Sequence, residues 1–122
     1  MRFYSPSLAT LALAALASGT ASAKPLDSGV LSALSTIQRN ADAVAQGRVA
    51  GTAVQGPARE IALAWGRIEP ALLRNGDVLV ETKMANASIA AFESDWQRAK
   101  NLRAEASEVR SRIADLVAAA KS

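Results

Sequence analysis

The side chains of this sequence that could do chemistry are carboxylates, hydroxyls, lysines and arginines. The 122 residues include no Cys and no His. Their absence excludes disulfides, c-type haem attachment, zinc fingers, and catalysis by a Cys or His nucleophile or base. No G-x-S-x-G, S-x-x-K or phosphate-binding glycine motif occurs either. Haem and copper would lack their customary ligands, because Met84 is the only methionine outside the first residue. We therefore expect no cofactor and no metal.

The carboxylates do not assemble into a catalytic pair. Glu93 and Asp95 are two positions apart, so their side chains would point away from each other on a helix. A helix N-cap is the better interpretation of Asp95. Asp77 and Glu81 are one turn apart at an expected helix start, where the macrodipole favours negative charge without any catalytic role. The sequence thus predicts a protein that is not an enzyme.

Arginines are the only candidate binding residues that the sequence offers. Three of them recur on the side of one expected helix that is opposite its apolar residues, and a fourth lies on the helix before it. Guanidinium groups bind carboxylates and phosphates through paired hydrogen bonds. The same pattern is also typical of the solvated back of an amphipathic helix. The candidate partner-binding residues are Arg39, Arg59, Arg67 and Arg74.

Residues 1–23 are expected to be a secretory signal peptide. Arg2 supplies the positive start, Leu8 to Ala17 form an apolar stretch, and residues 21–23 read Ala-Ser-Ala, an A-x-A cleavage site. A retained membrane anchor is the alternative, but ten apolar residues span only about half of the hydrocarbon core of a bilayer. No Cys follows the cleavage site, which excludes a lipoprotein anchor. We expect the mature chain to be periplasmic or secreted.

Residues 24–122 are expected to form a single helical-bundle domain. These 99 residues suffice for one hydrophobic core and not for two. The whole chain contains 28 alanines, a composition that favours helices over strands. The mature chain carries 13 Lys and Arg against 11 Asp and Glu, a net charge of +2. This small excess does not indicate nucleic-acid binding.

The first expected helix is defined by a cap, an apolar stripe and a glycine. Asp27 or Ser28 fits the N-cap, and Gly47 fits a left-handed stop. The apolar residues between them are spaced by four and three, the period of a helix buried on one side: Val30, Leu34, Ile37, Ala41 and Val44. A connection of about nine residues is expected to follow, with Val49 and Val54 tucked beneath it.

The second expected helix begins near Pro57, a residue that is tolerated in a first turn. Its apolar stripe keeps the same spacing: Ile61, Trp65, Ile68 and Leu72. Pro70 removes one backbone hydrogen bond and crowds the carbonyl of Gly66. We expect a kink between Gly66 and Pro70, not a full break, and a helix end at Asn75-Gly76.

The remainder of the chain has helical character up to the C-terminus. Asp77 fits an N-cap, so the preceding link is short and the two helices that it joins should be antiparallel. One helix of this length would measure roughly 60 Å, which is far too long for its partners. Ser94 with Gln97 fits a capping box, and Lys100-Asn101 resembles a helix end. We favour a break there, which gives four helices in place of three.

The expected fold class is therefore all-α: a small antiparallel helical bundle of three or four helices that follows an N-terminal signal peptide. Three aromatic residues lie in the apolar stripes and should anchor the core: Trp65, Phe92 and Trp96.

A short segment resembles a known family. Residues 34–38, Leu-Ser-Thr-Ile-Gln, resemble the L-T-x-x-Q motif of the Spy-type periplasmic chaperones, with Ser35 in the place of Thr. The resemblance covers five residues, and the second copy usual in that family is absent. It implies an all-helical, cradle-shaped dimer that shields unfolded proteins.

Two functions follow from these expectations. In the first, the chain is an exported, non-catalytic protein-interaction or structural module of the cell envelope that pairs with a protein partner or with itself. In the alternative, it is a Spy-like chaperone that binds unfolded chains in an apolar groove rimmed by the four arginines. Contact of the last helix with an anionic membrane is a weaker third hypothesis, because residues 95–122 carry a net charge of only +2.

Overall fold

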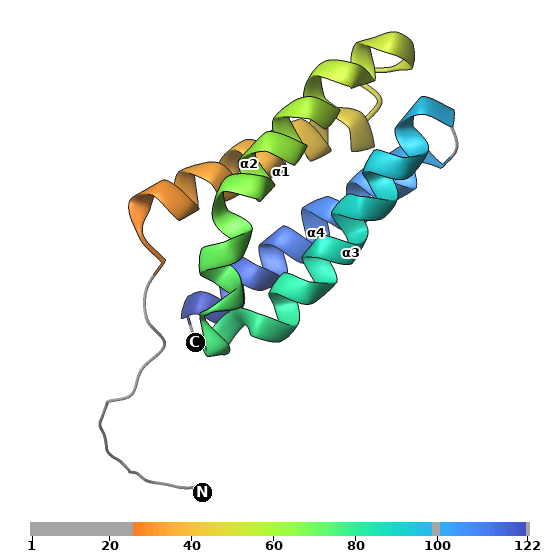
Figure 1. Ribbon diagram of the computed structural model, residues 1–122. Coiled ribbons are helices and arrows are strands. Elements are labelled where there is room, and N and C mark those ends of the chain that lie inside the picture. Colours follow the sequence, from red (N-terminus) through yellow and green to blue (C-terminus); the bar gives the residue numbers. More distant parts are fainter. Residues whose placement is uncertain (1–25, 99–100, 122) are drawn as a thin grey trace, which may run out of the picture.

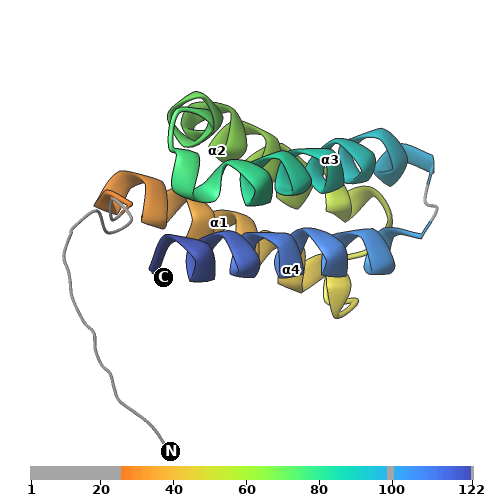
Figure 2. The same cartoon turned by 90° about the horizontal axis from the view of Figure 1, so that it is seen from below.

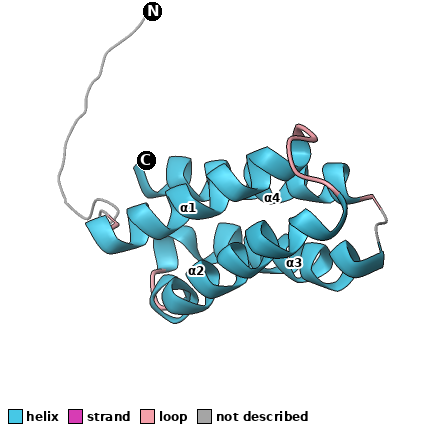
Figure 3. Cartoon of the chain, turned by 90° about the horizontal axis from the view of Figure 1, so that it is seen from above, coloured by secondary structure: helices cyan, strands magenta, loops and turns pink. Residues whose placement is uncertain are grey.

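The computed structural model describes residues 26–98 and 101–121. Within these residues the chain forms helices and turns and no strand (Figure 3). The four α-helices are α1 (Ser28–Ala45), α2 (Gln55–Leu73), α3 (Leu79–Asp95) and α4 (Leu102–Lys121). The all-α class is confirmed, and the described residues contain four α-helices, the favoured number of the two expected. The expected signal peptide and its cleavage site lie outside the described residues.

The helices form an antiparallel bundle in two layers (Figure 1). Helices α1 and α4 make one layer, and α2 and α3 make the other (Figure 2). Each helix packs on two neighbours, so α1 contacts α2 and α4, while α3 contacts α2 and α4. The contact between α2 and α3 is the smallest of these four. The start of α1 and the end of α4 lie at the same end of the bundle, as expected of an up-and-down topology.

The core is built from one side of each helix. Every apolar residue of the predicted stripes in α1 and α2 is buried, as are the large apolar residues of α4 that continue the pattern. The largest fully buried side chains are Phe92, Leu34, Ile37, Ile61, Leu72, Ile89, Ile113 and Leu116. Small alanines fill the remaining inward positions, which lets the helices approach closely.

The three aromatic residues do not share one environment. Phe92 is fully buried, and Trp65 is 4% exposed. The indole Nε1 of Trp65 donates a hydrogen bond of 2.9 Å to Oδ1 of Asn86, which links α2 to α3. Trp96 is only half-buried and packs against the edge of the core. The expectation that all three anchor the core is therefore wrong for Trp96, because it caps the end of α3, where it borders two open hollows.

Helix α1 begins and ends as its sequence predicts. The carboxylate of Asp27 accepts a hydrogen bond of 2.9 Å from the backbone N–H of Val30, which makes Asp27 the N-cap. Gly47 has a φ of 75°, in the left-handed region that glycine tolerates best. There the N–H of Gly47 donates to the carbonyl of Val44, and that of Arg48 donates to Ala43. Both bonds satisfy carbonyls that the helix end leaves without a partner.

The link from α1 to α2 is more ordered than a plain loop. A 3-10 turn, Gly51–Val54, leads directly into α2, and its last residue, Val54, is fully buried. Val49 packs against the core as well, so the predicted contacts of both valines are confirmed. Helix α2 then continues through Pro70 without a break, as predicted. Its ribbon changes direction along its length in Figure 1 and Figure 2.

The turn between α2 and α3 corrects one expectation. Asp77 is not the N-cap of α3, because a 3-10 turn, Gly76–Val78, precedes that helix. The side chain of Asn75 caps this turn by accepting a hydrogen bond of 3.0 Å from the N–H of Asp77. The link is nevertheless short, and α2 and α3 are antiparallel as expected.

The break between α3 and α4 exists but lies a little beyond the predicted capping box. Ser94 and Asp95 belong to the last turn of α3, so neither caps a new helix. The chain instead leaves α3 through a 3-10 turn, Trp96–Arg98, and enters α4 after Asn101, whose φ is 58°. The predicted helix end at Lys100 falls on a residue that the structure does not describe.

Candidate functional site

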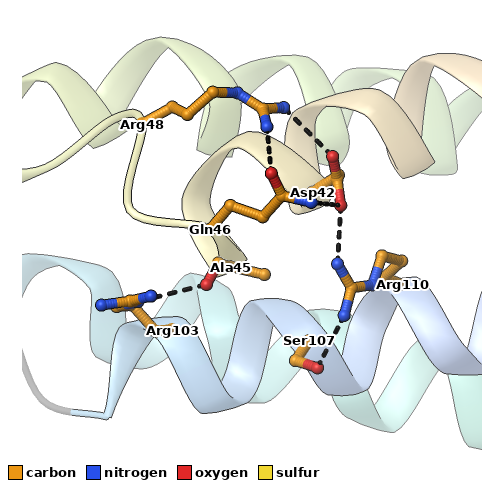
Figure 4. A network of polar contacts seen from close by, with 7 residues as sticks. All are labelled: Asp42, Ala45, Gln46, Arg48, Arg103, Ser107 and Arg110. Carbon is orange, nitrogen blue, oxygen red and sulfur yellow. Dashed lines mark hydrogen bonds and ion pairs between the residues drawn. The ribbon is translucent and has the colours of Figure 1, made fainter.

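A polar network holds the end of α1 against α4 (Figure 4). The Asp42 carboxylate accepts a hydrogen bond of 2.6 Å from Nη1 of Arg110 and one of 3.1 Å from Nη2 of Arg48. Gln46 adds a bond of 3.0 Å to the same carboxylate. The guanidinium groups of Arg110 and Arg48 lower the pKa of Asp42 below its ordinary value. Holding α1 against α4 is a sufficient explanation for this network.

The arginines of α4 are all engaged in contacts of this kind. Arg103 donates a hydrogen bond of 3.1 Å to the carbonyl of Ala45, which lies at the end of α1. Arg110 also binds the Ser107 hydroxyl at 3.2 Å. Arg112 pairs with Glu108 at 2.7 Å, one turn away. A membrane-binding role for the last helix loses support from these contacts, because its guanidinium groups already have partners.

Helix α2 differs from α4 in this respect. Arg59, Arg67 and Arg74 are exposed and have no hydrogen-bond or ion-pair partner among the described residues. The other candidate, Arg39 on α1, donates a hydrogen bond of 3.3 Å to the hydroxyl of Thr36. Three of the four candidates are thus cationic groups available to a ligand.

Two of the α2 arginines line one groove, which we call the arginine groove. It consists of two adjoining hollows of about 440 and 240 Å³ between the start of α1 and the end of α2, and these share Asp27, Val30 and Ala71. Arg67 lines the larger hollow and Arg74 the smaller. The other lining residues are Leu26, Gly29, Ser32, Ala33, Thr36, Ile68, Leu72 and Asn75.

The groove exists because small side chains meet there. Gly29, Ser32 and Ala33 face the groove from α1, and Ala71 faces it from α2. Buried Val30, Ile68 and Leu72 close its floor. The groove combines this apolar floor with Arg67 and Arg74 in its lining, and Arg39 is joined to it through Thr36. Such a site can bind an anion-bearing chain, and it presents no nucleophile that is activated by a neighbouring base.

The fourth candidate lies elsewhere. Arg59 lines a separate hollow of about 370 Å³ between the start of α2 and the end of α3, beside Glu93 and Trp96. Burial of its carboxyl raises the pKa of Glu93, although the residue as a whole is exposed. A second hollow of about 250 Å³ adjoins the other side of Trp96. The four predicted arginines therefore do not surround a single groove.

One pair of carboxylates does come together, and its members are ten positions apart in the sequence. Asp95 at the end of α3 lies beside Glu105 in the first turn of α4. Oε1 of Glu105 is buried without a hydrogen-bond partner among the described residues, although the residue as a whole is only half-buried. This burial and the neighbouring Asp95 raise the pKa of Glu105 to about 7. Sequence analysis missed the pair, because only the turn between α3 and α4 brings it together.

The pair does not form a metal centre with other ligands. Within the described residues, no three side chains of the Asp, Glu, His or Cys type cluster closely enough to hold an ion.

Apolar groups on the surface are dispersed. The exposed large apolar residues among those described are Leu31, Leu63, Leu73, Val80 and Met84, which come from three helices. Only Val80 and Met84 are one turn apart, and Sδ of Met84 is already contacted by Arg112 at 3.9 Å. In the described part of the chain, no helix combines the length and apolar character that a membrane span needs.

Comparison with known proteins gives no relative for this arrangement. The chain matches no model of a known protein family, no curated protein and no solved structure.

Proposed function

We propose that this chain is an exported, non-catalytic helical-bundle module that binds a protein partner, and that the arginine groove is its binding surface. The proposal rests on a difference between the arginines of α4 and those at the end of α2. The arginines of α4 are occupied by contacts within the chain, whereas Arg67 and Arg74 line a groove and have no partner among the residues that the structure describes.

The chemistry of the groove supports protein binding over catalysis. Arginine is enriched where proteins bind each other, because its planar head forms paired hydrogen bonds and its stem covers apolar surface. The groove offers apolar contact from exposed Ala71 and half-buried Leu26, above the nearly buried Val30 and Ile68. A ligand would therefore gain both buried apolar area and ion pairs.

The test is site-specific crosslinking in the cells that produce the chain. A photoreactive amino acid at Ala71, which is exposed and lines the groove, should yield a discrete adduct with one partner. The same group at Ala87, an exposed position on α3, should not. Equal adducts from both positions, or none from Ala71, would reject the groove as the binding surface.

Charge variants provide the matched control. The double variant Arg67→Gln, Arg74→Gln should abolish the adduct formed from Ala71. The variant Lys83→Gln, Lys121→Gln removes the same number of positive charges from exposed positions outside the groove and should leave the adduct intact. If both variants lose the adduct, net charge and not the groove governs binding.

Export is a separate part of the proposal and rests on the pattern of residues 1–23. The mass of the chain recovered from the periplasm or the medium should correspond to a start at Lys24. Recovery of the full-length chain from the cytoplasm alone would reject export.

The chaperone alternative has less support. Shielding an unfolded chain requires a continuous apolar surface, whereas the exposed apolar residues are scattered over three helices. A chaperone should suppress the aggregation of a model client at near-stoichiometric ratios. The interaction module proposed here should fail that test.

A further inference from the structure

We propose that the arginine groove takes an extended acidic peptide segment whose two carboxylates are three residues apart. This inference rests on the proposed function and specifies the partner. It follows from the spacing of Arg67 and Arg74, the residues that line the groove and the position of one carboxylate within it.

The two arginines set the spacing. Arg67 lies in the last two turns of α2, and Arg74, seven positions later, is its C-cap residue, so their backbones are about 10 Å apart along the helix axis. A peptide in the extended polyproline II conformation has three residues per turn and rises 3.1 Å per residue. Its side chains at positions i and i+3 therefore point in one direction about 9 Å apart. The flexible stems of the arginines can absorb the small difference.

The shape of the groove favours an extended chain over a helix. An α-helix is about 10–12 Å wide and would need a long apolar strip to pack as a fifth member of the bundle. The floor offers only the slightly exposed Val30 and Ile68, beside the hydroxyl group of Ser32. An extended backbone can use this hydroxyl as a hydrogen-bond partner.

Asp27 limits which acidic segments fit. It lines both hollows, and its carboxylate caps α1. A third carboxylate between the two bound ones would face Asp27 and be repelled. The two intervening residues of the ligand must therefore be neutral or basic. Binding thus depends on the order of the charges in the peptide as well as on their number.

A membrane surface fits this arrangement less well. A polybasic membrane site gathers a cluster of about four to eight Lys and Arg side chains. Arg67 and Arg74 line a recess, and the arginines of α4 are held by Asp42, Glu108 and the end of α1. Two unpaired guanidinium groups thus lie in the recess, and none lies on α4 among the described residues.

The test uses fluorescent ten-residue peptides with blocked ends and measures anisotropy on titration with the mature chain. One peptide carries two glutamates separated by two small neutral residues. Its control has the same composition with the glutamates adjacent. We expect the spaced peptide to bind at least about fivefold more tightly, because only it can pair with both guanidinium groups. Arg67→Gln or Arg74→Gln should each weaken its binding about tenfold.

Two further variants test whether the contact is direct. Lys83→Gln removes an exposed charge on α3 and should change affinity by less than about twofold. Arg67→Glu with Arg74→Glu should reject the acidic peptide and bind a peptide with lysines at the same spacing. Circular dichroism should show unchanged helix content in each variant, because the altered side chains are exposed.

Three results would overturn the inference. Equal affinity for the peptides with spaced and with adjacent glutamates would mean that the groove is a non-specific basic patch. Absence of peptide binding, while an adduct still forms from Ala71, would retain the proposed function and reject this partner. Sedimentation with vesicles of equal parts phosphatidylglycerol and phosphatidylcholine, without peptide binding, would assign the groove to lipid phosphate. Register-specific peptide binding without any Ala71 adduct would instead reject the proposed function alone.

Discussion

Nη1 of Arg110 lies 2.6 Å from Oδ1 of Asp42, a residue 68 positions earlier, so the last helix closes onto the first through an ion pair (Figure 4). Arg48 shares the same carboxylate. We expect Asp42→Asn to lower the melting temperature at low salt. The loss should shrink in about 1 M salt, where the Debye length falls to about 3 Å and ion pairs between partly exposed side chains weaken. Thermal melts at both salt concentrations measure it.

The matched control is a double-mutant cycle. Arg110→Gln alone should destabilise the chain, and its effect should be smaller once Asp42 is already Asn, because the partner is gone. If the two effects add at low salt, the pair does not contribute to stability.

Truncation to alanine should destabilise the chain more at Phe92, in α3, than at Trp96, in the turn that follows. Phe92 is fully buried, and we expect Phe92→Ala to lower the free energy of unfolding by about 3–5 kcal/mol. Trp96 is half-buried between two open hollows, so we expect Trp96→Ala to lower it by about 1–2 kcal/mol. Urea or thermal unfolding of both variants tests this order. A larger loss at Trp96 would place the indole in the core.

Local sequence signals predicted the helices, because each of these signals acts within a few residues. The carboxylate of Asp27, the left-handed Gly47 and the spacing of apolar residues act over one or two turns. Errors arose where two signals competed. The side chain of Asn75, not that of Asp77, provides the cap in the turn before α3. Ser94 lies inside α3 although it fits a capping box. A capping pattern does not specify whether the helix before it has already ended.

The site was less predictable, because it depends on which helices become neighbours. The sequence placed Arg59, Arg67 and Arg74 on one side of a helix. Residues two turns apart share that side, yet Arg67 and Arg74 face α1 while Arg59 lies nearer α3. The pairing of Asp95 with Glu105 likewise requires the turn that joins α3 and α4. Neither relationship is encoded in local spacing.

Thr82 offers a test of the core. It is fully buried in α3, and its Oγ1 has no hydrogen-bond partner among the described residues. Thr82→Val replaces the hydroxyl with a methyl group of similar size and removes the cost of desolvating it. We expect a gain of about 1 kcal/mol, which would raise the melting temperature by roughly 4–8 °C. Thr52→Val, at an exposed position, should change it little. A destabilised Thr82→Val variant would mean that the hydroxyl has a partner.

Glu105 should make stability depend on pH near neutrality. Its pKa is about 7 in the folded chain against an ordinary value of 4.5. The folded state therefore holds this proton more tightly than the unfolded state does. The resulting stability is complete below about pH 4.5 and is lost as the pH rises through about 7. One pKa unit corresponds to about 1.4 kcal/mol. Since Glu105 is half-exposed and solvent screens part of the effect, we expect a loss of roughly 1–2 kcal/mol between pH 5 and pH 8.

Glu105→Gln isolates this contribution, because glutamine keeps the shape of the protonated acid and cannot ionise. Urea unfolding at pH 5 should give nearly equal stabilities for this variant and the parent chain, whereas at pH 8 the variant should be more stable. Glu60→Gln, at an exposed position on α2, should leave the pH profile of the parent unchanged. Asp42 does not interfere in this range, because its lowered pKa confines its loss of stability to pH values below about 4. A Glu105→Gln variant that keeps the full decline from pH 5 to pH 8 would assign that decline to another group.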